Sequence, residues 1–235
     1  MGAGSTERRE GPTKRIVVDR AVALSAERGI TGWSMRDIAA EVGVVPSVIY
    51  HYFPNKEALC DAVVGRVCES IRIPNVDLEW KPWFTALAKA IRPPLMRYCG
   101  ISDRLIQGKF VAQLLPVLDA AYAKLEEAGF GERSALAYSM IANTLMHAIS
   151  ARNLRSPHRD GERHDLNEML ARFEPMLEES PGLRGIVDDY LEPLSRPGEE
   201  DELSEEYYRL LTASVLDGVE CTLLGPSASD RRARR

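Results

Sequence analysis

Apolar residues recur every three or four positions along most of the chain, the spacing that places them on one face of a helix. In the first such segment Val17, Ala21 and Leu24 share a face, Thr13 stands at the N-cap position and Gly29 supplies the stop. The same spacing continues to residue 224, and no segment shows the alternation typical of a strand. The pattern therefore predicts an all-α protein.

The second predicted helix has the most complete start signal. Ser34 and Asp37 form the S-x-x-D pattern of a capping box, in which each side chain accepts a hydrogen bond from the other residue's backbone N–H. Trp33 before the cap and Ile38 after it can close a hydrophobic staple. Gly43 permits the left-handed backbone that a sharp turn needs, so we predict that the helix ends there.

A third short helix is predicted directly after this turn. It begins near Val45, and Pro46 suits its first turn, where a backbone N–H has no partner to lose. Ile49 and Phe53 form its buried stripe, and Asn55 caps a fourth helix that continues to the next proline. The chain is thus predicted to hold two short helices joined by a tight turn, followed by a longer helix.

The remaining residues are predicted to form a larger helical body. Its helices are expected near 82–95, 103–115, 117–127, 132–151 and 205–224. Pro93-Pro94 should kink or interrupt the first of them. The helix at 132–151 carries two apolar stripes, so both of its faces should be covered. Residues 153–202 are rich in charge, proline and glycine, and they are predicted to form a long, partly mobile connection with short amphipathic pieces.

Charge is distributed unevenly along the chain. The 235 residues, 45% of them hydrophobic, can bury one large core or two modest ones, and they carry a net charge of -5. This balance argues against a protein that coats nucleic acid by charge alone. Residues 1–72 hold ten Lys/Arg against nine Asp/Glu, so the acidic excess lies in the C-terminal body. The difference is a mild pointer to DNA contact through the N-terminal segment.

Cysteine usage and the terminal sequences favour an intracellular protein. The chain has four cysteines, Cys60, Cys68, Cys99 and Cys221. They include no C-x-x-C pair, which favours reduced thiols. Because no apolar run could cross a membrane and the N-terminus lacks a signal-peptide core, we expect a cytoplasmic location. Residues 1–11 and 225–235 are expected to form disordered tails.

Residues 13–63 resemble the N-terminal domain of the TetR family of bacterial transcriptional regulators. The matching residues are Gly29, Ser34-Met35-Arg36-Asp37-Ile38-Ala39, Val42-Gly43-Val44, Ile49-Tyr50 and Phe53-Pro54-Asn55-Lys56-Glu57-Ala58-Leu59. The C-terminal body is similar, much more loosely, to the tetracycline-repressor branch. The resemblance implies a helix-turn-helix DNA-binding domain at 12–72 and a helical ligand-binding and dimerisation domain at 76–224.

In such domains the third helix enters the DNA major groove and its neighbours grip phosphates. The resemblance places phosphate contacts on Ser34, Arg36, Tyr50 and Lys56, whose polar groups suit an anion. It places base-facing side chains on Val45, Pro46, Ser47, Val48 and Tyr52. Val45 replaces the usual Ser or Thr cap, and Pro46 stands where a polar residue often reads a base. With so few donors, readout is expected to depend on thymine methyl contacts and DNA shape.

The resemblance also implies a small-molecule pocket enclosed by segments such as 80–129, and a homodimer interface formed by helices near 132–151 and 205–224. The candidate pocket residues are Trp83, Met96, Cys99, Phe110, Tyr138, Met140, Asn143 and His147. Asn143 and His147 lie four residues apart on one helical face and could orient a polar group of the ligand. The alternative is that His147 is a hydrogen-bonded helix histidine and the other residues are ordinary core.

Three classes of function are weighed. The leading hypothesis is a homodimeric, ligand-responsive DNA-binding regulator, a repressor released from a palindromic operator by a small apolar or amphipathic effector. The alternative is a helical ligand-binding or protein-interaction module without effective DNA binding, which the unusual Val45 and Pro46 favour. An enzyme is the least favoured class, because the sequence offers no catalytic arrangement or phosphate loop. No cofactor or metal is expected, since His158 and His164 lack a pattern of partner ligands.

Overall fold

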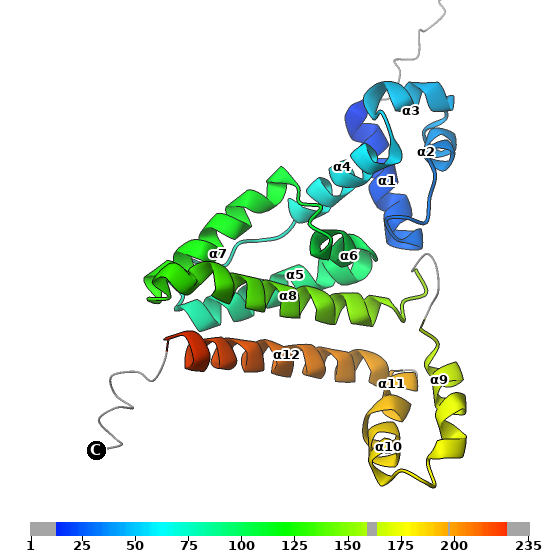
Figure 1. The fold of residues 1–235 in the computed structure, drawn as a ribbon. Coiled ribbons are helices and arrows are strands. Elements are labelled where there is room, and N and C mark those ends of the chain that lie inside the picture. Colours follow the sequence, from blue (N-terminus) through cyan, green and yellow to red (C-terminus); the bar gives the residue numbers. More distant parts are fainter. Residues whose placement is uncertain (1–12, 159–163, 197, 225–235) are drawn as a thin grey trace, which may run out of the picture.

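The chain folds into helices that form an N-terminal unit and a larger body (Figure 1). Residues 13–158, 164–196 and 198–224 are described in the computed structural model, and these residues contain no strand. The N-terminal unit consists of α1 (Lys14–Arg28), α2 (Met35–Val42), α3 (Pro46–Tyr52) and α4 (Lys56–Cys68). The prediction of an all-α protein with a helix-turn-helix near its N-terminus is confirmed.

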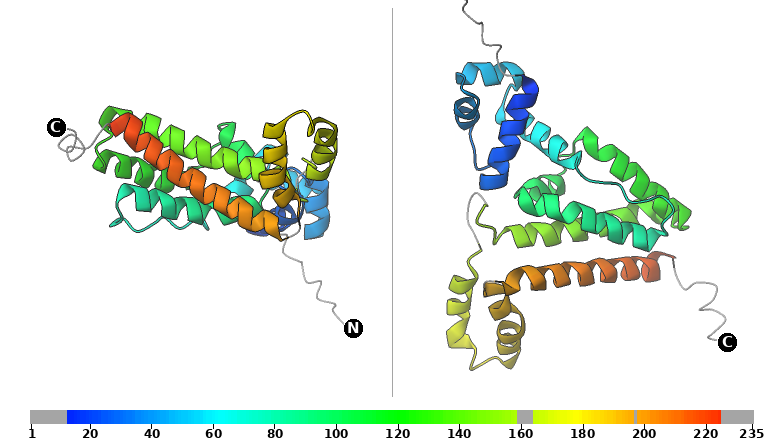
Figure 2. Two further views of the ribbon diagram at one scale, coloured as in Figure 1. Left: turned by 90° about the horizontal axis from the view of Figure 1, so that it is seen from below. Right: turned by 180° about the vertical axis from the view of Figure 1, so that it is seen from behind.

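The body is built around two long helices that lie side by side, α8 and α12 (Figures 1 and 2). Its elements are α5 (Trp80–Arg97), α6 (Ile101–Ile106), the 3₁₀ turn η1 (Ala112–Leu114), α7 (Leu115–Glu127), the 3₁₀ turn η2 (Gly131–Arg133), α8 (Ser134–Asn153), α12 (Glu199–Val219) and the π-helical end η5 (Glu220–Leu224). The inward stripe of α8 is buried, namely Ala137, Ile141, Leu145 and Ile149. This stripe places α8 at the centre of the body, between α12 and the layer of α5, α6 and α7.

Side-chain caps define the N-terminal helices. The hydroxyl of Thr13 accepts from the backbone N–H of Ile16 at 3.4 Å. Ser34 and Asp37 form the reciprocal capping box, with bonds of 2.7 and 3.2 Å. Asn55 caps α4 by accepting from the backbone N–H of Ala58 at 2.8 Å. These three caps are predictable from the sequence because each one joins residues only three positions apart.

The turn between α2 and α3 depends on backbone conformation alone. Gly43 has φ of 74° and ψ of 36°, the left-handed region, and a Cβ at this position would meet no atom within 4 Å. The glycine is therefore required by the backbone angle and not by crowding. Val45 starts α3 without a side-chain hydrogen bond, and Pro46 follows it at the first helical position.

Helix α4 joins the N-terminal unit to the body. It packs against α1 on one side and against η1 on the other. Seven of its 13 residues are buried, among them Val63 and Val67. Gly65 lies against the body, since a Cβ there would approach the side chain of Gln113 at 2.8 Å.

Ion pairs and one backbone bond reinforce this junction. The guanidinium of Arg104 in α6 is only 5% exposed and contacts Glu57 at 3.0 Å and Asp61 at 2.6 Å, both on α4. Beside them, the backbone N–H of Ile30 donates to the carbonyl of Cys99 at 2.9 Å. The N-terminal unit is thus attached to the body at α4 and, separately, at the end of α1.

Two adjacent prolines in α5 do not interrupt the helix. The sequence predicts a kink or break at Pro93-Pro94, but α5 continues beyond them to Arg97 and closes with a 3.0 Å bond from the N–H of Tyr98 to the carbonyl of Pro94. A proline removes a helix hydrogen bond, so the cost is confined to the last turns of the helix. Leu95, 1% exposed, anchors those turns in the core.

The segment at 153–202 is more regular than the sequence pattern predicts. It forms a helical hairpin at the N-terminal end of α12 (Figure 1). The hairpin consists of α9 (Leu166–Phe173), the 3₁₀ turn η3 (Glu174–Met176), α10 (Pro181–Ile186), the π-helical η4 (Val187–Leu191) and α11 (Glu192–Ser195). Val187 and Leu194 are buried in the hairpin, and α11 packs against α12. The amphipathic pieces expected within this connection, near 165–179 and 183–194, are helices in the structure. The expected disordered tails lie outside the described residues.

The carboxylate of Glu57 gives the junction a pH dependence. The hydrogen bond from Arg104, followed by the charge of Arg104, lowers the pKa of Glu57 below its ordinary value of 4.5. A lowered pKa contributes stability above pH 4.5 that is lost as the pH falls through the folded-state pKa. Because Glu57 is largely exposed, Glu57→Gln should lower the free energy of unfolding by at most about 1 kcal/mol at neutral pH.

This difference is measured by urea unfolding of the two proteins at about pH 7 and about pH 3, where it should shrink toward zero. Glu41→Gln, at an exposed position of α2, is the matched control and should change stability at neither pH. An unfolding difference for Glu57→Gln that is the same at both pH values would refute the ion-pair explanation.

Candidate functional site

The outer surface of α3 carries the side chains that were predicted to face DNA bases. Val45 is 63% exposed and Ser47 is also exposed. Pro46, Val48 and Tyr52 are half-buried, so part of each side chain reaches solvent. Ile49 and Phe53 turn inward and are buried. The surface offers methyl groups, a hydroxyl and an aromatic ring, and it carries no carboxylate.

His51 belongs to the same surface, although the predicted set of contacts does not include it. It is exposed and lies four residues after Ser47, on the same helical face. Its ring makes an edge contact with Tyr52, with centroids 5.5 Å apart. The i, i+4 spacing from Ser47 is the sequence signal that could have added His51 to the contact set.

The four predicted phosphate contacts differ in how freely they can act. Arg36 and Tyr50 are exposed, Tyr50 by 50%. Arg36 makes no ion pair with any described residue. Lys56 is engaged within the fold: its Nζ donates to the carbonyl of Thr31 at 2.7 Å and lies 5.3 Å from the centroid of the Trp33 ring. Arg36 is therefore the predicted contact whose charge is least used by the protein itself.

Ser34 has one group left for an external partner. Its backbone N–H donates to Asp37, and its hydroxyl oxygen accepts from the N–H of Asp37. The hydroxyl hydrogen takes no part in these two bonds, but the hydroxyl also interacts with the Asp37 carboxylate, so an external anion would compete with that carboxylate for it. The backbone N–H of Ser34, and then its hydroxyl, lower the pKa of Asp37, which is therefore charged near the same helix start.

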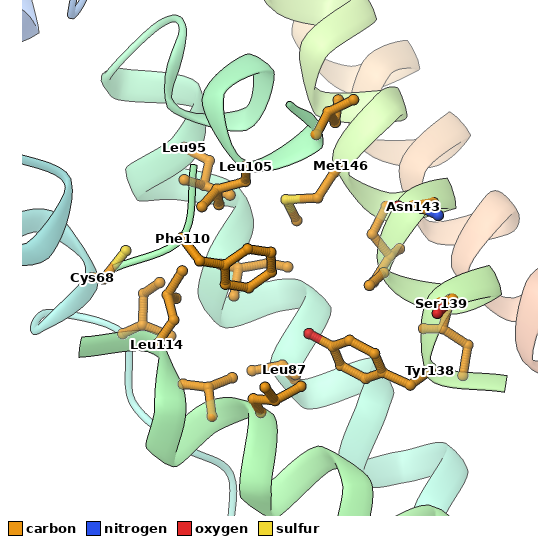
Figure 3. A pocket seen from close by; sticks show the side chains of 18 of the residues that line it. Cys68, Leu87, Leu95, Leu105, Phe110, Leu114, Tyr138, Ser139, Asn143 and Met146 are labelled. Atoms are coloured by element: carbon orange, nitrogen blue, oxygen red, sulfur yellow. The ribbon is translucent and has the colours of Figure 1, made fainter. Parts of the chain in front are cut away.

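An apolar cavity of about 300 Å³ lies between α4, α5, α6, η1, α7 and α8. Figure 3 shows Phe110 and Tyr138 entering it from different elements, with the Tyr138 hydroxyl inside. The lining consists of Cys68, Ile71, Phe84, Leu87, Ile91, Leu95, Leu105, Ile106, Phe110, Leu114, Val117, Leu118, Tyr138, Ser139, Ile141, Ala142, Asn143, Leu145 and Met146. None of these side chains is charged. The polar groups are one thiol, two hydroxyls and one amide.

The phenol of Tyr138 is neutral under ordinary conditions, because burial raises its pKa above the usual value of 10.0. It can therefore both donate and accept a hydrogen bond inside the cavity. The hydroxyl of Ser139 already donates to the carbonyl of Ala135 at 2.8 Å. Asn143 belongs to the lining but is exposed, on the same face of α8 as His147, so Tyr138 is the lining group best placed to orient a ligand.

Only three of the eight predicted pocket residues line this cavity, namely Phe110, Tyr138 and Asn143. Trp83 is fully buried in the core, and its ring makes an edge contact with the ring of Phe84. Met96 lines a different, smaller cavity, and Cys99 lies at the contact between the body and the N-terminal unit.

Met140 and His147 point away from the cavity, on the exposed outer face of α8. His147 donates from Nδ1 to the carbonyl of Asn143 at 2.8 Å, the bond expected of a helix histidine. The two apolar stripes of α8 are real, but the stripe with Met140 and His147 faces outward. The amino-acid composition of the two stripes did not show which of them faces outward.

The lining residues that the prediction omitted come from all the elements around the cavity, with five from α8 and four from α5. Cys68 and the following Ile71 close the cavity from the α4 side, and Leu87 and Leu95 close it from α5. The helical spacing of the α5 residues is visible in the sequence, whereas their exposure to a cavity depends on the distance between helices. That distance is a property of the tertiary structure.

Exposed apolar side chains continue along α8 and α12 on the side away from the cavity. Leu136 is 53% and Met140 is 39% exposed on α8, and Tyr207 and Leu210 are 47% and 49% exposed on α12. Exposed apolar side chains on two long helices that pack side by side are a common signature of an association surface. This surface falls within the helices predicted to form a dimer interface.

Two further kinds of site were sought in the described part of the chain. Among residues 13–158, 164–196 and 198–224, no three His, Cys, Asp or Glu side chains are grouped so that they could hold a metal ion. No described helix is long and apolar enough to cross a membrane.

Comparison with known proteins relates the N-terminal unit to a family. Residues 17–63 match the bacterial regulatory proteins of the tetR family. The chain is 28% identical over 123 residues to tetracycline repressor protein class A from transposon 1721 of Escherichia coli, covering 51% of this chain and 57% of the repressor. It is 35% identical over 92 residues to the HTH-type transcriptional repressor DrrR1 of Streptomyces coeruleorubidus, covering 37% of this chain and 34% of that protein.

These alignments span roughly a third to just over half of the curated relatives. A solved structure extends the likeness to the body: the Streptomyces coelicolor TetR family protein ActR in complex with actinorhodin. It superposes with a TM-score of 0.65 over 88% of this chain and 96% of that chain. At 15% identity this match shows a shared fold. The helix-turn-helix unit is therefore similar in sequence to the bacterial regulatory proteins of the tetR family, and the chain shares the fold of ActR.

Proposed function

We propose that this protein is a ligand-responsive DNA-binding transcriptional regulator. It is a cytoplasmic homodimer that represses transcription from a palindromic operator until a small effector releases it, and it is not an enzyme. The observation that supports this proposal most directly is the course of α4. Lys56, at its first turn, lies beside the DNA-reading surface, and Cys68, at its last turn, lines the apolar cavity.

Shape and methyl contacts dominate the proposed DNA readout. The exposed Val45, with the half-buried Pro46 and Val48, can meet thymine methyl groups, while Ser47 and His51 supply the polar contacts. Arg36, Tyr50 and the hydroxyl of Ser34 border this surface and suit phosphate oxygens. A twofold dimer would place two such surfaces about 34–36 Å apart, on successive turns of the major groove.

The effector is proposed to be uncharged and mostly apolar, with a hydroxyl or carbonyl group. No charged side chain lines the cavity, so a buried charge on the ligand would have no partner. The Tyr138 hydroxyl can satisfy one polar group of the ligand. The structure of ActR, a protein of the same fold, in complex with actinorhodin supports a small-molecule effector.

The ligand would release the protein from DNA if it bound more tightly to the protein with α4 in one orientation than in another. Contacts with Cys68 and Ile71 would favour a particular tilt of α4, and Arg104 would transmit it through Glu57 and Asp61. Because a ligand shifts a population only by its differential affinity, the contacts on α4 and not those on α5 alone decide the response.

DNA binding is tested at Arg36. Arg36→Ala should weaken binding to the DNA upstream of the protein's own gene at least about tenfold, because it removes a charge-assisted phosphate contact, and should reduce the salt dependence by about one ion per site. Fluorescence anisotropy at several salt concentrations measures both effects. Arg172→Ala, on the exposed surface of the hairpin, is the matched control. Equal affinity of all three proteins would exclude Arg36 as a phosphate contact, and absence of binding by the wild-type protein would favour the alternative of a module that does not bind DNA.

The cavity is tested by filling it. Ala142→Phe adds a ring to the lining and should abolish the fluorescence enhancement of N-phenyl-1-naphthylamine, an uncharged apolar probe. Overpacking is expected to cost roughly 1–3 kcal/mol of stability, so thermal unfolding confirms that the variant is folded. Ala123→Phe places the same ring on the exposed surface of α7 and should leave the probe signal unchanged. Undiminished probe binding by folded Ala142→Phe would place the ligand elsewhere.

The dimer is tested at Gly218 of α12. This residue is exposed, and a Cβ added to it meets no atom within 4 Å of the same chain, so Gly218→Arg is compatible with the folded protomer. A buried arginine in a helix–helix interface should dissociate the dimer, and sedimentation velocity should show a monomer. Gly182→Arg in the hairpin, also in open space, is the control. A dimer that survives Gly218→Arg would exclude this part of α12 from the interface.

A further inference from the structure

A second, smaller cavity lies on the opposite side of α5 and α8 from the apolar one. It encloses about 100 Å³ between α5, α8, η4 and the first half of α12. Arg92, Arg152, Arg155, Ser204, Tyr190 and Tyr208 are its principal polar and aromatic lining residues. The lining holds three guanidinium groups and no carboxylate, the reverse of the uncharged lining of the apolar cavity.

The carboxylates that pair with these arginines lie outside the lining and are better solvated. Glu205, on Arg92, is 57% exposed, and Asp201, on Arg152, is 88% exposed. The arginine side chains, in contrast, are only 14–16% exposed. Charge is therefore compensated mainly from the solvent side, and the side that faces the cavity is cationic.

Several guanidinium donors are left unused. Nε of Arg152 is buried without a hydrogen-bond partner, although both of its terminal nitrogens are paired. Arg155 pairs with described residues only through Nε, to Glu200 at 3.2 Å. A guanidinium has five N–H donors in a planar fork that matches the oxygens of a carboxylate or phosphate.

The remaining walls suit the same kind of ligand. Nη2 of Arg92 donates to the hydroxyl of Ser204 at 3.1 Å, and its guanidinium lies 5.4 Å from the centroid of the Tyr208 ring. Burial raises the pKa of Tyr190 and Tyr208, so both phenols are neutral and do not repel an anion. The Tyr208 hydroxyl donates to the carbonyl of Ala88 at 3.4 Å, so Tyr190 is the phenol that can donate to the anion. Tyr207, 47% exposed, lies at the rim, which gives the cavity access to solvent.

We propose that this tri-arginine cavity is a binding site for a small oxyanion, a phosphate or a carboxylate group, separate from the apolar effector cavity. A volume of about 100 Å³ exceeds the need of a single water and accommodates an anion of this size. The anion would join α8 to η4 and α12, and so would hold the hairpin against the body.

The site shares its walls with the apolar cavity. In α5, Leu95 faces the apolar cavity and the next residue, Met96, lines the anion site. In α8, Met146 lines the apolar cavity and Ile149 lines the anion site. Occupation of one cavity therefore changes the packing of the helices that enclose the other, and the two ligands are expected to affect each other's affinity.

The proposal is tested by isothermal titration calorimetry with sodium phosphate and with sodium acetate, at constant ionic strength maintained with sodium chloride. Saturable binding of either anion at one site per chain is expected. Binding in the phosphate titration would identify the ligand group as a phosphate, and binding in the acetate titration would identify it as a carboxylate. Arg155→Met should weaken it at least tenfold, whereas Arg172→Met, a 74% exposed arginine of α9, should leave it within twofold of wild type. Absence of saturable binding of both anions, or equal binding by the two variants, would overturn the proposal.

A crystal structure of the wild-type protein grown with the binding anion removes any dependence on how the variants fold. Density for the anion between Arg152 and Arg155 is expected. An anion found only at other positions would also overturn the assignment.

Discussion

Helix α4 has to bury apolar side chains on two sides at once, and the arrangement of the whole molecule depends on that requirement. Seven of its 13 residues are buried, and they face α1 in the N-terminal unit as well as η1 in the body. Neither part alone could cover both sides of the helix. The hydrophobic effect therefore joins the two parts through α4, and a movement of α4 is felt by both.

Ion pairs determine the orientation of α4 relative to α6 at this junction. Arg104 is nearly buried, and its charge is compensated only by Glu57 and Asp61 of α4 among the described residues. Separating α6 from α4 would leave the guanidinium without its partners in a poorly hydrated place, which is costly. The apolar surface of α4 thus supplies cohesion, and the ion pairs of Arg104 select one orientation.

The sequence predicted those features that depend on neighbouring residues. The caps at Thr13, Ser34 and Asn55 and the left-handed Gly43 each involve residues a few positions apart, and all four are present in the structure. The family resemblance added the helix-turn-helix, because its signature lies within the same short stretch. The helices of the body were located for a similar reason, from apolar spacing.

Features that depend on packing between distant helices were harder to predict. Both stripes of α8 are apolar, so only the positions of α5 and α12 decide that Tyr138 faces the cavity and Met140 faces solvent. The amphipathic pieces of the hairpin were expected from the sequence, whereas their pairing into a hairpin depends on contacts between its own helices, where Val187 and Leu194 are buried. The arginine cluster brings Arg92, Arg155 and Tyr190 together across about a hundred residues, a distance over which sequence spacing carries no information.

The bond between the N–H of Ile30 and the carbonyl of Cys99 has a consequence for how the protein can evolve. A bond between two main chains is independent of the side chains at both positions, so ordinary substitutions there do not delete it. The ion pairs on α4, in contrast, disappear with a single change. Sequence drift can therefore adjust how strongly α4 is held while the end of α1 keeps its place, so that sensitivity to a signal can change without loss of the geometry that transmits it.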